Sequence, residues 1–554
     1  MNGLIMLVIS SLIFLAAYFI YGRYLEKTWG IDEKRPTPAH EFADGVDYVA
    51  SKKGVVFGHA FASIAGAGPI NGPIIAAIFG WVPVLLWIII GGIFFGAVHD
   101  FAALYASVKN KGKTIGYIIE LYIGKTGKKL FLLFVWLFSL LVIAAFADIV
   151  AGTFNGFGPK IGSDLITANA SVATTSIMFI IFAVLIGFFN KYYQPSSLLG
   201  TIVSIILLIL AIYIGLNTPI YLTRQFWLYF VFAYIFIASI TPVWILLQPR
   251  DYLNSFLLVA MIAGAFIGII FTNPAINITP FAGFEVNGNH MFPILFVTVA
   301  CGAISGFHSL VDSGTVSKQI DNERDMLPVS FGAMLVECLL AVIALIAVGA
   351  IATGGVMPKG TPPVIFATAI SGFLTQLGLP EATTFTIITL AISAFALTSL
   401  DSVARVGRLA FQEFFYSDEK VKQAAAIKVF SNKYFATSVT LFFGYLLSVN
   451  GYQKIWPLFG SANQLLAALA LIACAVFLRK TQREGFMLYV PMFAMLLITF
   501  TALSISIYKL FSKMGTGVFN LASDGLQLVL ALLLLALGIL VANSGIKKLF
   551  IKND

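Results

Sequence analysis

Charged residues are scarce in this chain: they make up 11% of its 554 residues, whereas 59% are hydrophobic. A soluble fold cannot bury that much apolar surface, so the composition excludes a soluble protein and predicts a membrane protein. The three cysteines, Cys301, Cys338 and Cys474, lie inside apolar segments without disulfide or metal-ligand spacing, and no cofactor is expected. The net charge of +9 would suit an acidic partner, but the basic residues follow the membrane topology, so no nucleic-acid partner is expected.

Apolar runs of about 17 to 25 residues, the length that crosses a bilayer, recur along the whole chain. They predict an all-α integral membrane protein of about fifteen spans, the first a retained helix and not a cleaved signal peptide. The predicted spans lie approximately at 3–21, 54–79, 82–107, 129–153, 174–190, 197–216, 225–247, 253–272, 293–311, 329–352, 383–400, 434–448, 456–478, 487–508 and 525–544.

Lysine and arginine are distributed unevenly over the loops that join these spans. When alternate loops are assigned to opposite sides, all but six of the 34 basic residues fall on one side. The exceptions are Lys160, Arg224, Lys359, Lys454, Lys509 and Lys513. Because basic loops stay in the cytoplasm, the N-terminus is predicted to lie outside the cell and the C-terminus inside it.

One predicted span, 54–79, is interrupted in its middle by the run Ala-Gly-Ala-Gly-Pro-Ile-Asn-Gly-Pro at 65–73. A break of this kind frees backbone amides and carbonyls at membrane depth, where only protein or a water-filled cavity can satisfy them. The segment from Gly66 to Pro73 is therefore predicted to be unwound, and it is the first candidate for a substrate or ion site.

The predicted topology permits an internal repeat. Five spans run from 54 to 216 beginning inside, and the next five run from 225 to about 400 beginning outside. Two such units of opposite orientation are typical of a leucine-transporter-type (APC-like) inverted-repeat core. The second unit opens with a helix that carries Ser239-Ile240-Thr241-Pro242 and ends in Gln248-Pro249. The expected divisions are 1–53, 54–216, 217–414 and 415–554.

Carboxylates inside apolar spans are costly and tend to face a bundle interior or a cavity. Asp148 and Glu337 each lie on one helical stripe with small residues. His99 and Asp100 follow two glycines of the same predicted span, toward its cytoplasmic end. One interpretation is a proton relay or cation site formed by Glu337, Asp100 and His99. The alternative is a set of buried carboxyls that hydrogen-bond a neighbouring helix, which suits Asp148 best.

A further stretch, residues 300–315 with Thr298 before it, places small and hydroxylated residues at helical spacing on one face. Hydroxyls on such a face, Ser305 and Ser309 above all, can coordinate sodium, but they also serve plain helix packing. His308 in the same stretch is a candidate for substrate or proton binding. The face comprises Thr298, Gly302, Ser305, Ser309 and Ser313.

Several longer strings are spread over nearly the whole chain. They are Phe57-Gly58-His59 with Ile64 to Pro69, Gly96-Ala97-Val98 with Asp100-Phe101, Leu247 to Asn254, Ala300 to His308, Gly332 to Leu335 with Glu337, Phe395 to Thr398 with Asp401, Arg405 and Arg408, and Trp456 to Gly460 with Ala462 to Gln464. In these strings the chain resembles the carbon starvation protein A family. The resemblance implies a prokaryotic inner-membrane secondary transporter for nutrient scavenging under carbon starvation, from a family linked to peptide and to pyruvate uptake.

Two positions depart from the family's pattern. Two adjacent histidines commonly follow the Phe-Gly pair, where this chain has His59 and Ala60, and glutamine commonly stands where this chain has His99. The broken span loses one polar group, and the neighbouring helix gains a titratable one. Because either change can alter the substrate or the coupling ion, both peptides and pyruvate stay open as substrates.

The expected mechanism is alternating access around the unwound segment, coupled to sodium or protons. Amides at a half-helix N-terminus would receive a substrate carboxylate, which both pyruvate and a peptide provide. The expected substrate-binding residues are His59, Gly66, Ala67, Gly68, Pro69, Asn71 and His308. Asp401, Arg405 and Arg408 are expected to form a gate or an anchoring ion-pair network, with interfacial snorkelling of the arginines as the alternative. Asn463 and Gln464 are expected to be structural hydrogen-bonders.

Two other classes of function stay open. One is a channel or sensor without stoichiometric coupling, and the other is a membrane-embedded redox protein in which paired histidines hold haem. No enzyme motif accompanies the histidines, so an enzyme is not expected. The expected partners are a small-molecule or peptide substrate and the lipid bilayer, and the sequence leaves the oligomeric state open.

Overall fold

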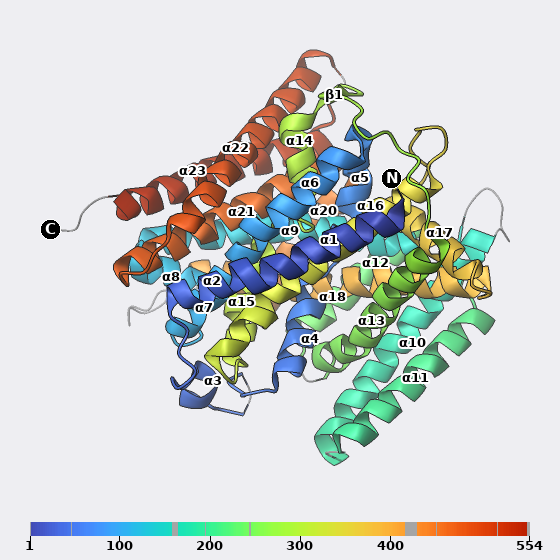
Figure 1. Cartoon of the computed structure of the whole chain (residues 1–554), viewed down its shortest axis with the longest axis horizontal. Coiled ribbons are helices and arrows are strands. Elements are labelled where there is room, and N and C mark those ends of the chain that lie inside the picture. The colour runs from blue at the N-terminus through green and yellow to red at the C-terminus, as the bar shows by residue number, and fades with distance from the viewer. Residues whose placement is uncertain are drawn as a thin grey trace. The chain divides into compact units, whose positions relative to one another are not determined.

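A computed structural model of the chain describes residues 2–45, 47–157, 164–193, 196–242, 245–415, 429–449, 451–517 and 519–550. The named elements are helices apart from one two-stranded sheet (Figure 1). Within these ranges eleven helices are long and apolar enough to cross a membrane, and one bent pair of helices raises the number to twelve. The chain is therefore an all-α, multi-pass membrane protein.

The predicted spans coincide with helices, but three of them fall short of a full span. Helix α12 (Arg224–Ile240) has 17 residues, α20 (Lys433–Ser448) has 16, and the predicted span 293–311 is divided between α14 and α15. The total of fifteen spans thus stays a prediction. The predicted end of the span 383–400 is wrong, because α18 continues to Phe415. Lys160 and residues 416–428 lie outside the described residues.

The contacts within the chain divide it into two compact units. The first unit comprises Met1–Leu4, Val142–Asn277 and Ile346–Tyr452, and the second comprises Ile5–Leu141, Ile278–Leu345 and Gln453–Asp554. Helices α9 (Lys125–Thr153) and α16 (Ala333–Ile351) pass from one unit into the other. The predicted division at 54, 217 and 415 remains a prediction.

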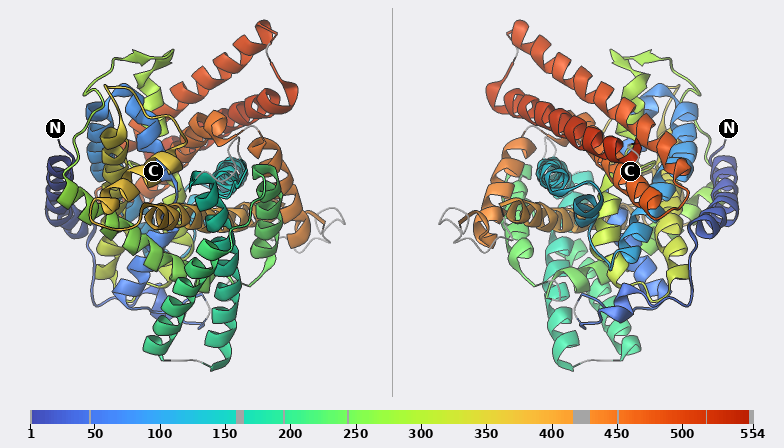
Figure 2. Two further views of the ribbon diagram at one scale, coloured as in Figure 1. Left: turned by 90° about the vertical axis from the view of Figure 1, so that its right-hand side faces the viewer. Right: turned by 90° about the vertical axis from the view of Figure 1, so that its left-hand side faces the viewer.

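The first unit consists of helices that are mostly long. Helices α10 and α11 lie side by side in each view of the ribbon (Figures 1 and 2). The hydroxyl of Ser196 accepts the N–H of Leu199 and so begins α11, as an N-cap serine does. Besides parts of α9 and α16, the helices are α10 (Asp164–Tyr193), α11 (Ser197–Asn217), α12, α13 (Leu247–Thr272), α17 (Pro362–Thr375), α18 (Glu381–Phe415) and α20.

The second unit holds shorter helices and the single sheet, with η denoting 3-10 or π-helical turns. Its elements are α1 (Gly3–Ala17), η1 (Tyr18–Gly22), α2 (Arg23–Trp29), α3 (Pro38–Glu41), α4 (Lys53–Ile64), α5 (Gly68–Ala76), η2 (Ala77–Phe79), α6 (Trp81–Gly91), η3 (Gly92–Ala97), α7 (Val98–Lys109), α8 (Ile115–Tyr122), β1 (Glu285–Val286), β2 (Asn289–His290), α14 (Met291–Thr298), α15 (Gly306–Gly314), η4 (Val316–Lys318), η5 (Glu323–Asp325), η6 (Leu327–Gly332), α21 (Tyr452–Lys480), α22 (Phe486–Gly515), η7 (Leu521–Gly525) and α23 (Leu526–Phe550).

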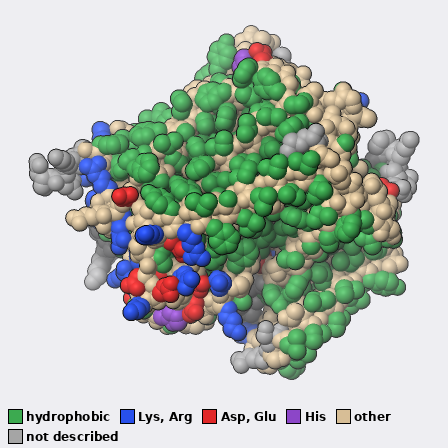
Figure 3. All heavy atoms as spheres, viewed as in Figure 1, with side chains coloured by type: hydrophobic (Ala, Val, Ile, Leu, Met, Phe, Trp, Pro, Cys, Tyr) green, Lys and Arg blue, Asp and Glu red, His purple; other side chains and the backbone are tan. Residues whose placement is uncertain are grey.

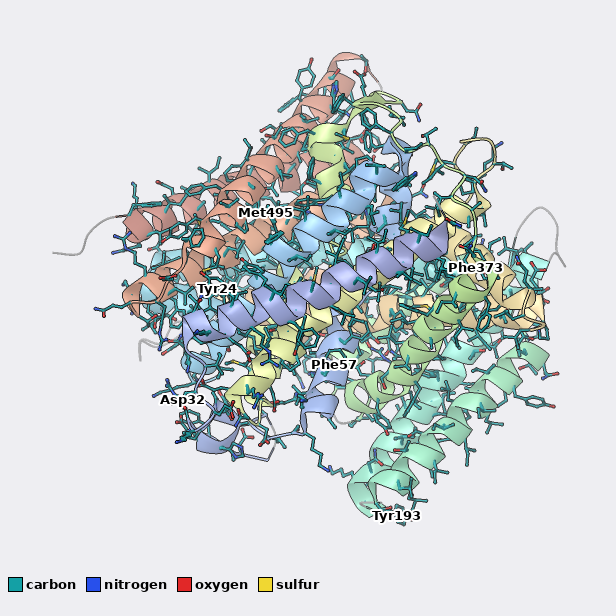
Figure 4. All side chains as sticks on the ribbon, in the orientation of Figure 1. Tyr24, Asp32, Phe57, Tyr193, Phe373 and Met495 are labelled. Carbon is teal, nitrogen blue, oxygen red and sulfur yellow. The ribbon has the colours of Figure 1, made fainter. Side chains whose placement is uncertain are left out.

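Charged side chains of the second unit gather near α2 and α3, whereas hydrophobic side chains cover α1, α22 and α23 in the same view (Figure 3). In this charged cluster Nζ of Lys109 lies 2.6 and 2.7 Å from the two carboxylate oxygens of the buried Glu323. The backbone N–H of Asp32, which is labelled in Figure 4, donates to the same carboxylate at 2.9 Å. Arg324 pairs with Glu33 at 3.2 Å. These bonds attach the loop before α4 to the segment before α16.

Candidate functional site

The first broken helix lies where the sequence predicts it. Helices α4 and α5 are halves of one apolar segment that is bent by 46°, and Ala65–Ala67 between them is not helical. The N–H of Gly66 donates to the carbonyl of Ile64 at 2.7 Å, which tightens the chain into a turn. The predicted extent of the break is wrong, because Gly68–Pro73 is already helical. Pro69 allows the early restart, since a first-turn residue needs no N–H donor.

A second broken helix lies at residues 299–305, between α14 and α15. The predicted continuous face of hydroxyls on the span 293–311 is therefore wrong. Thr298 ends α14, and Ser305 is an extended residue just before α15. Glycine allows this segment to pack closely, because a Cβ on Gly302 would lie 2.7 Å from the Cβ of Ala341. Such contact requires a residue without a side chain.

The two breaks touch each other within the second unit. A Cβ on Gly72 in α5 would lie 2.7 Å from the carbonyl oxygen of Thr298. A Cβ on Gly68 would lie 2.6 Å from the Cβ of Cys301. Residues Gly68 to Ile74 of α5 are buried. The first turn of α5 is thus pressed directly against the unwound segment between α14 and α15.

Two amides of α21 satisfy the ends of the second broken helix. The Oδ1 of Asn463 accepts the N–H of Phe307 at 3.1 Å, and its Nδ2 donates to the hydroxyl of Ser305 at 3.1 Å. The Nε2 of Gln464 donates to the carbonyl of Phe296 at 2.7 Å. Free N–H and C=O groups at helix ends require such partners when they are buried. Both amides are structural hydrogen-bonders, as the sequence predicts.

The two serines expected to bind a coupling cation already have protein partners. The hydroxyl of Ser305 bonds to Asn463, and the hydroxyl of Ser309 donates to the carbonyl of Gly306 at 2.7 Å. A serine that donates to its own helix's backbone keeps its oxygen close to that helix. Sodium binding by these hydroxyls remains a prediction, and the geometry offers it no separate support.

Four titratable residues form a continuous buried chain in the second unit. The carboxylate of Asp100 lies between two imidazoles: Oδ1 is 2.7 Å from Nδ1 of His99, and Oδ2 is 2.8 Å from Nδ1 of His308. On the other side of the second ring, Nε2 of His308 lies 3.3 Å from Oε2 of Glu337. All four side chains are at most 1% exposed. We call these residues the His–carboxylate chain.

Hydrogen-bonding capacity constrains where the protons of this chain can reside. An ionised carboxylate only accepts, so Asp100 requires the Nδ1 of His308 to carry a proton. If the ring is neutral, its Nε2 is then an acceptor that faces a second acceptor, the carboxylate of Glu337. Two acceptors 3.3 Å apart in a buried site require a proton between them. The proton resides either on Glu337 or on His308, and the pair can exchange it.

Both carboxylates of this chain follow a π-helical turn. The π-helical η3 leads into α7, which carries Asp100, and the π-helical η6 leads into α16, which carries Glu337. Single π-helical turns shift the register of the side chains that follow, and they are common at functional sites. A Cβ on Gly96 in η3 would lie 2.7 Å from the terminal methyl of Met334 in α16, so η3 and α16 pack tightly against each other.

Other candidate residues lie apart from the His–carboxylate chain. His59 on α4 has an imidazole Nε2 that is buried and has no partner among the described residues. Asn71 on α5 is fully buried, donates from Nδ2 to the carbonyl of Ala67 at 2.7 Å, and has no partner for Oδ1 in the described part of the chain. Asp312, which sequence reasoning missed, is 2% exposed, and its Oδ2 also has no partner there. Its spacing four residues after His308 places it on the same face of α15.

In the first unit, the buried partner of Asp401 is a residue that sequence reasoning missed. Both Arg250 and the hydroxyl of Tyr234 bond to Oδ2 of Asp401, the latter at 2.8 Å. Arg250 is 1% exposed. Arg250 stands between Pro249 and Asp251, in the short predicted loop between spans 225–247 and 253–272, so the sequence carries no signal of its burial. We call Arg250, Asp401 and Tyr234 the arginine cluster.

The expected ion pair between Asp401 and the arginines that follow it is wrong. Arg405 donates to the carbonyls of Ala238 and Thr241 at 3.0 and 2.8 Å, and Arg408 donates to the carbonyl of Ser239 at 2.8 Å. These are the last carbonyls of α12 and the residue after it, which have no partner within that helix. Asp401 is paired with Arg250 instead, and no ion pair within 4.0 Å joins it to Arg405 or Arg408 among the described residues.

Asp148 has the structural role that the sequence favours for it. Its Oδ2 accepts the N–H of Tyr452 at 2.7 Å, and its Oδ1 pairs with Arg224. The carboxylate therefore connects α9 to the N-terminal ends of α12 and α21 within the first unit. A carboxylate near a helix N-terminus is also favoured by the helix dipole.

Comparison with known proteins identifies the family. The family model described as carbon starvation protein CstA matches residues 2–358 and 354–502. The chain is 34% identical over 539 residues to the peptide transporter CstA of Bacillus subtilis (strain 168), covering 87% of this chain and 86% of that protein. It is 29% identical over 622 residues to the pyruvate/proton symporter BtsT of Escherichia coli (strain K12), covering 94% and 84%.

Among solved structures, a manganese transporter from Eremococcus coleocola overlays with a TM-score of 0.48 and 11% identity, covering 89% of this chain and 94% of that one. A similarity this low carries no argument about fold or substrate. The sequence matches, in contrast, extend over most of the chain at about one residue in three. The chain therefore belongs to the carbon starvation protein CstA family.

Proposed function

We propose that this protein is a secondary active transporter that moves a small carboxylate-bearing substrate by alternating access and couples this movement to protons. The observation that carries the proposal is the facing pair of His308 and Glu337, which must hold one exchangeable proton inside a buried site. Buried ionisable groups in membrane spans are expensive and mark ion or proton pathways. The relatives named as a peptide transporter and a pyruvate/proton symporter support both substrate classes.

The proposed substrate region is the contact between the two broken helices, with His59, His308 and the residues from Gly66 to Asn71. In the arrangement described, Gly68 lies against Cys301, so a carboxylate can reach the N-terminus of α5 only after the two breaks separate. Separation would expose the first amides of α5 and the unpaired Oδ1 of Asn71. Helix N-termini attract carboxylates through these amides and the helix dipole. Opening and closing of this contact is the proposed alternating-access step.

The proton is favoured over sodium by the state of the candidate ligands. His99, Asp100, His308 and Glu337 can accept or release protons, whereas the hydroxyls of Ser305 and Ser309 are engaged. Sodium coupling at those hydroxyls is the second candidate. In this proposal protonation of Glu337 neutralises the buried chain and favours the separation of α15 from its neighbours.

The discontinuous helices suggest where the repeats begin. The first opens with α4 and α5, as the sequence predicts. The second discontinuous helix is α14 with α15, whereas α12, where the second repeat is predicted to open, ends at Ile240 before Pro242. We propose that an inverted-repeat core uses the two broken helices as corresponding elements.

The proposal also covers the orientation of the protein in the membrane and the role of Asp401, Arg405 and Arg408. The chain would lie in the inner membrane of a prokaryotic cell with its N-terminus outside and C-terminus cytoplasmic, as the distribution of lysine and arginine predicts. The gate role of Asp401, Arg405 and Arg408 stays a prediction. Their bonds to Arg250, Tyr234 and α12 favour the anchoring alternative.

Uptake by the purified protein in proteoliposomes tests the proposal. Pyruvate, a dipeptide and a tripeptide are each supplied under an imposed proton gradient and, separately, an imposed sodium gradient. Accumulation of at least one of them above the external concentration is expected under the proton gradient alone. Equilibration without accumulation would indicate a channel, sodium-dependent accumulation would reject proton coupling, and a haem absorbance band would support the redox alternative.

A further inference from the structure

Two arginines of α18 are fixed side by side against the end of α12 in the first unit. Arg405 and Arg408 are three residues apart and therefore share one face of the helix. Each reaches carbonyls at the C-terminal end of α12: Arg405 those of Ala238 and Thr241, and Arg408 that of Ser239. A helix C-terminus has a partial negative charge that favours cations. The guanidinium groups are thus held in place by main-chain atoms.

Neither guanidinium has an acidic partner among the described residues. The carboxylate nearest along the helix, Asp401, is bonded to Arg250 and Tyr234 instead. Arg408 is 9% exposed, and the Nε atoms of both arginines are buried without a hydrogen-bond partner among the described residues. Two adjacent cations repel each other, and removing such charges from water is costly without a counter-ion. The charge of Asp401 acts on Arg405 from a distance, but no described carboxylate lies within 4.0 Å of either guanidinium, so the pair can accept a further anion.

The spare hydrogen-bond donors of this pair suit a phosphate. Each guanidinium has five N–H donors, and the two groups together make three hydrogen bonds to carbonyls. Because Nη2 of Arg405 and Nη1 of Arg408 make these bonds and both Nε atoms are buried, the groups left to donate are Nη1 of Arg405 and Nη2 of Arg408. A phosphate has several oxygens and can accept from one such group of each guanidinium. Because the main chain already orders the two side chains, little further ordering is needed for an anion to bind.

The surrounding surface identifies the source of that phosphate. Ile237 on α12 is 59% exposed, and Leu409 on α18, next to Arg408, is 49% exposed. Large exposed apolar side chains on a membrane protein face acyl chains. Helix α12 ends only three residues after Ile237 and is followed by the exposed Pro242. Arg405 and Arg408 therefore lie at the level where apolar surface gives way to the polar end of a helix, which is where lipid headgroups lie.

We propose that Arg405 and Arg408 form a binding site for the phosphate of an anionic phospholipid. Basic pockets between membrane helices bind anionic headgroups in this manner. The bound phosphate would neutralise the two guanidiniums and link α12 to α18. The site is independent of the proposed proton coupling, since its residues belong to other helices than the His–carboxylate chain.

Thermal unfolding of the delipidated full chain in detergent tests this site. The probes are phosphatidylglycerol, which is anionic, phosphatidylcholine, which is zwitterionic, and inorganic phosphate. Phosphatidylglycerol is expected to raise the melting temperature more than equal amounts of phosphatidylcholine. The double variant Arg405→Gln with Arg408→Gln is expected to lose this difference. A control that removes the same charge at exposed residues of α23, Lys547→Gln with Lys548→Gln, is expected to retain it.

A charge-preserving variant keeps the test informative if the glutamine variant does not fold. Arg405→Lys with Arg408→Lys retains both charges, but an ammonium lacks the rigid plane that lets one guanidinium bond a carbonyl of α12 and present a second NH2 group to the phosphate. The affinity of this variant for phosphatidylglycerol is therefore expected to fall about tenfold, as measured by native mass spectrometry. Equal affinity in this variant would overturn the proposal, as would a wild type that does not prefer phosphatidylglycerol. An equal thermal shift from inorganic phosphate would overturn the assignment to a lipid.

Discussion

The two buried clusters of this protein each centre on an aspartate that is 0% exposed, but their partners differ. In the arginine cluster Asp401 bonds to Arg250, whose guanidinium stays charged at any physiological pH. In the His–carboxylate chain Asp100 bonds to His99 and His308, whose imidazoles, unlike a guanidinium, can give up a proton. Burial of a carboxylate therefore does not identify a coupling site. The partner decides whether the buried charge is fixed or exchangeable.

The two clusters also differ in the groups that surround them. Arg250 bonds to the hydroxyl of Tyr234 as well as to Asp401, and a second carboxylate, Asp251, lies 3.5 Å from its guanidinium. Glu337 faces the Nε2 of His308 at 3.3 Å, and its Oε1 makes no hydrogen bond to the described residues. A cluster with fixed charge should contribute mainly to stability. A cluster with exchangeable protons should contribute mainly to transport. Four substitutions test this contrast, from the largest expected effect on the free energy of unfolding to the smallest.

The largest loss of stability is expected for Arg250→Met. The substitution leaves Asp401 buried without its cation, and breaking a buried pair in this way costs about 3–5 kcal/mol. The free energy of unfolding in mixed detergent micelles measures the effect. Adding Asp401→Leu to Arg250→Met should recover most of the loss, because the unpaired charge is then removed. A double variant no more stable than Arg250→Met would show that the pair is not the source of the stability.

A smaller loss is expected at the contact between the broken helices. In Gly72→Ala the new methyl group would lie 2.7 Å from the carbonyl oxygen of Thr298, a backbone atom that cannot move freely. Overpacking of this kind costs about 1–3 kcal/mol. The matched control is Gly58→Ala on α4, which has open space around it and should be neutral or stabilising by up to about 1 kcal/mol. Equal effects of the two variants on thermal unfolding would contradict the described contact.

Glu337→Gln is expected to change stability by less than about 1 kcal/mol, because the side chain keeps its shape and its amide can donate to the Nε2 of His308, which faces Oε2 at 3.3 Å. Its effect on transport should be large. The amide has the same shape but cannot exchange the proton, so accumulation under a proton gradient should fall to the level of empty liposomes. Exchange of internal for external substrate needs no net proton movement and should persist. Loss of both activities together with a lower melting temperature would instead mean that Glu337 is a structural residue.

The smallest effect is expected for His99→Gln, which retains a donor for Asp100 at one end of the chain. The change in the free energy of unfolding should be smaller than for the variants above, because the glutamine amide can donate to Oδ1 of Asp100 in place of Nδ1 of His99. Proton-driven uptake should also be retained, because His308 and Glu337 are unaltered. His308→Gln, in contrast, removes the ring that joins the two carboxylates and should abolish accumulation. If His99→Gln abolishes accumulation as fully, the essential proton pathway includes His99.

The sequence predicts the first break and not the second, for a physical reason. The segment at 65–69 contains Gly66, Gly68 and Pro69, residues that interrupt helices by their own backbone preferences. The segment at 299–305 has no proline, and its break depends on close packing around Gly302 and on bonds from Asn463. Tertiary contacts of this kind leave no pattern in the local sequence. The prediction of a single face of hydroxyls there is wrong because such a face requires an unbroken helix.

The candidate site was predictable residue by residue but not as an arrangement. The cost of a charge inside a membrane identifies Asp100, His308 and Glu337 separately. That these three meet depends on how α7, α15 and α16 pack, which helical spacing cannot reveal. The same limit applies to Arg250, whose partner Asp401 lies 151 residues further along the chain. Sequence reasoning paired Asp401 with the arginines nearest to it and so missed the one that binds it.

The most direct measurement of the central claim is proton movement driven by substrate. Proteoliposomes that contain a pH-sensitive dye receive external pyruvate or a dipeptide with no imposed ion gradient. For the wild type the account predicts acidification of the lumen as substrate enters. For Glu337→Gln it predicts none, although that variant still exchanges internal for external substrate. Equal acidification in both proteins would contradict a coupling role for the proton shared by His308 and Glu337.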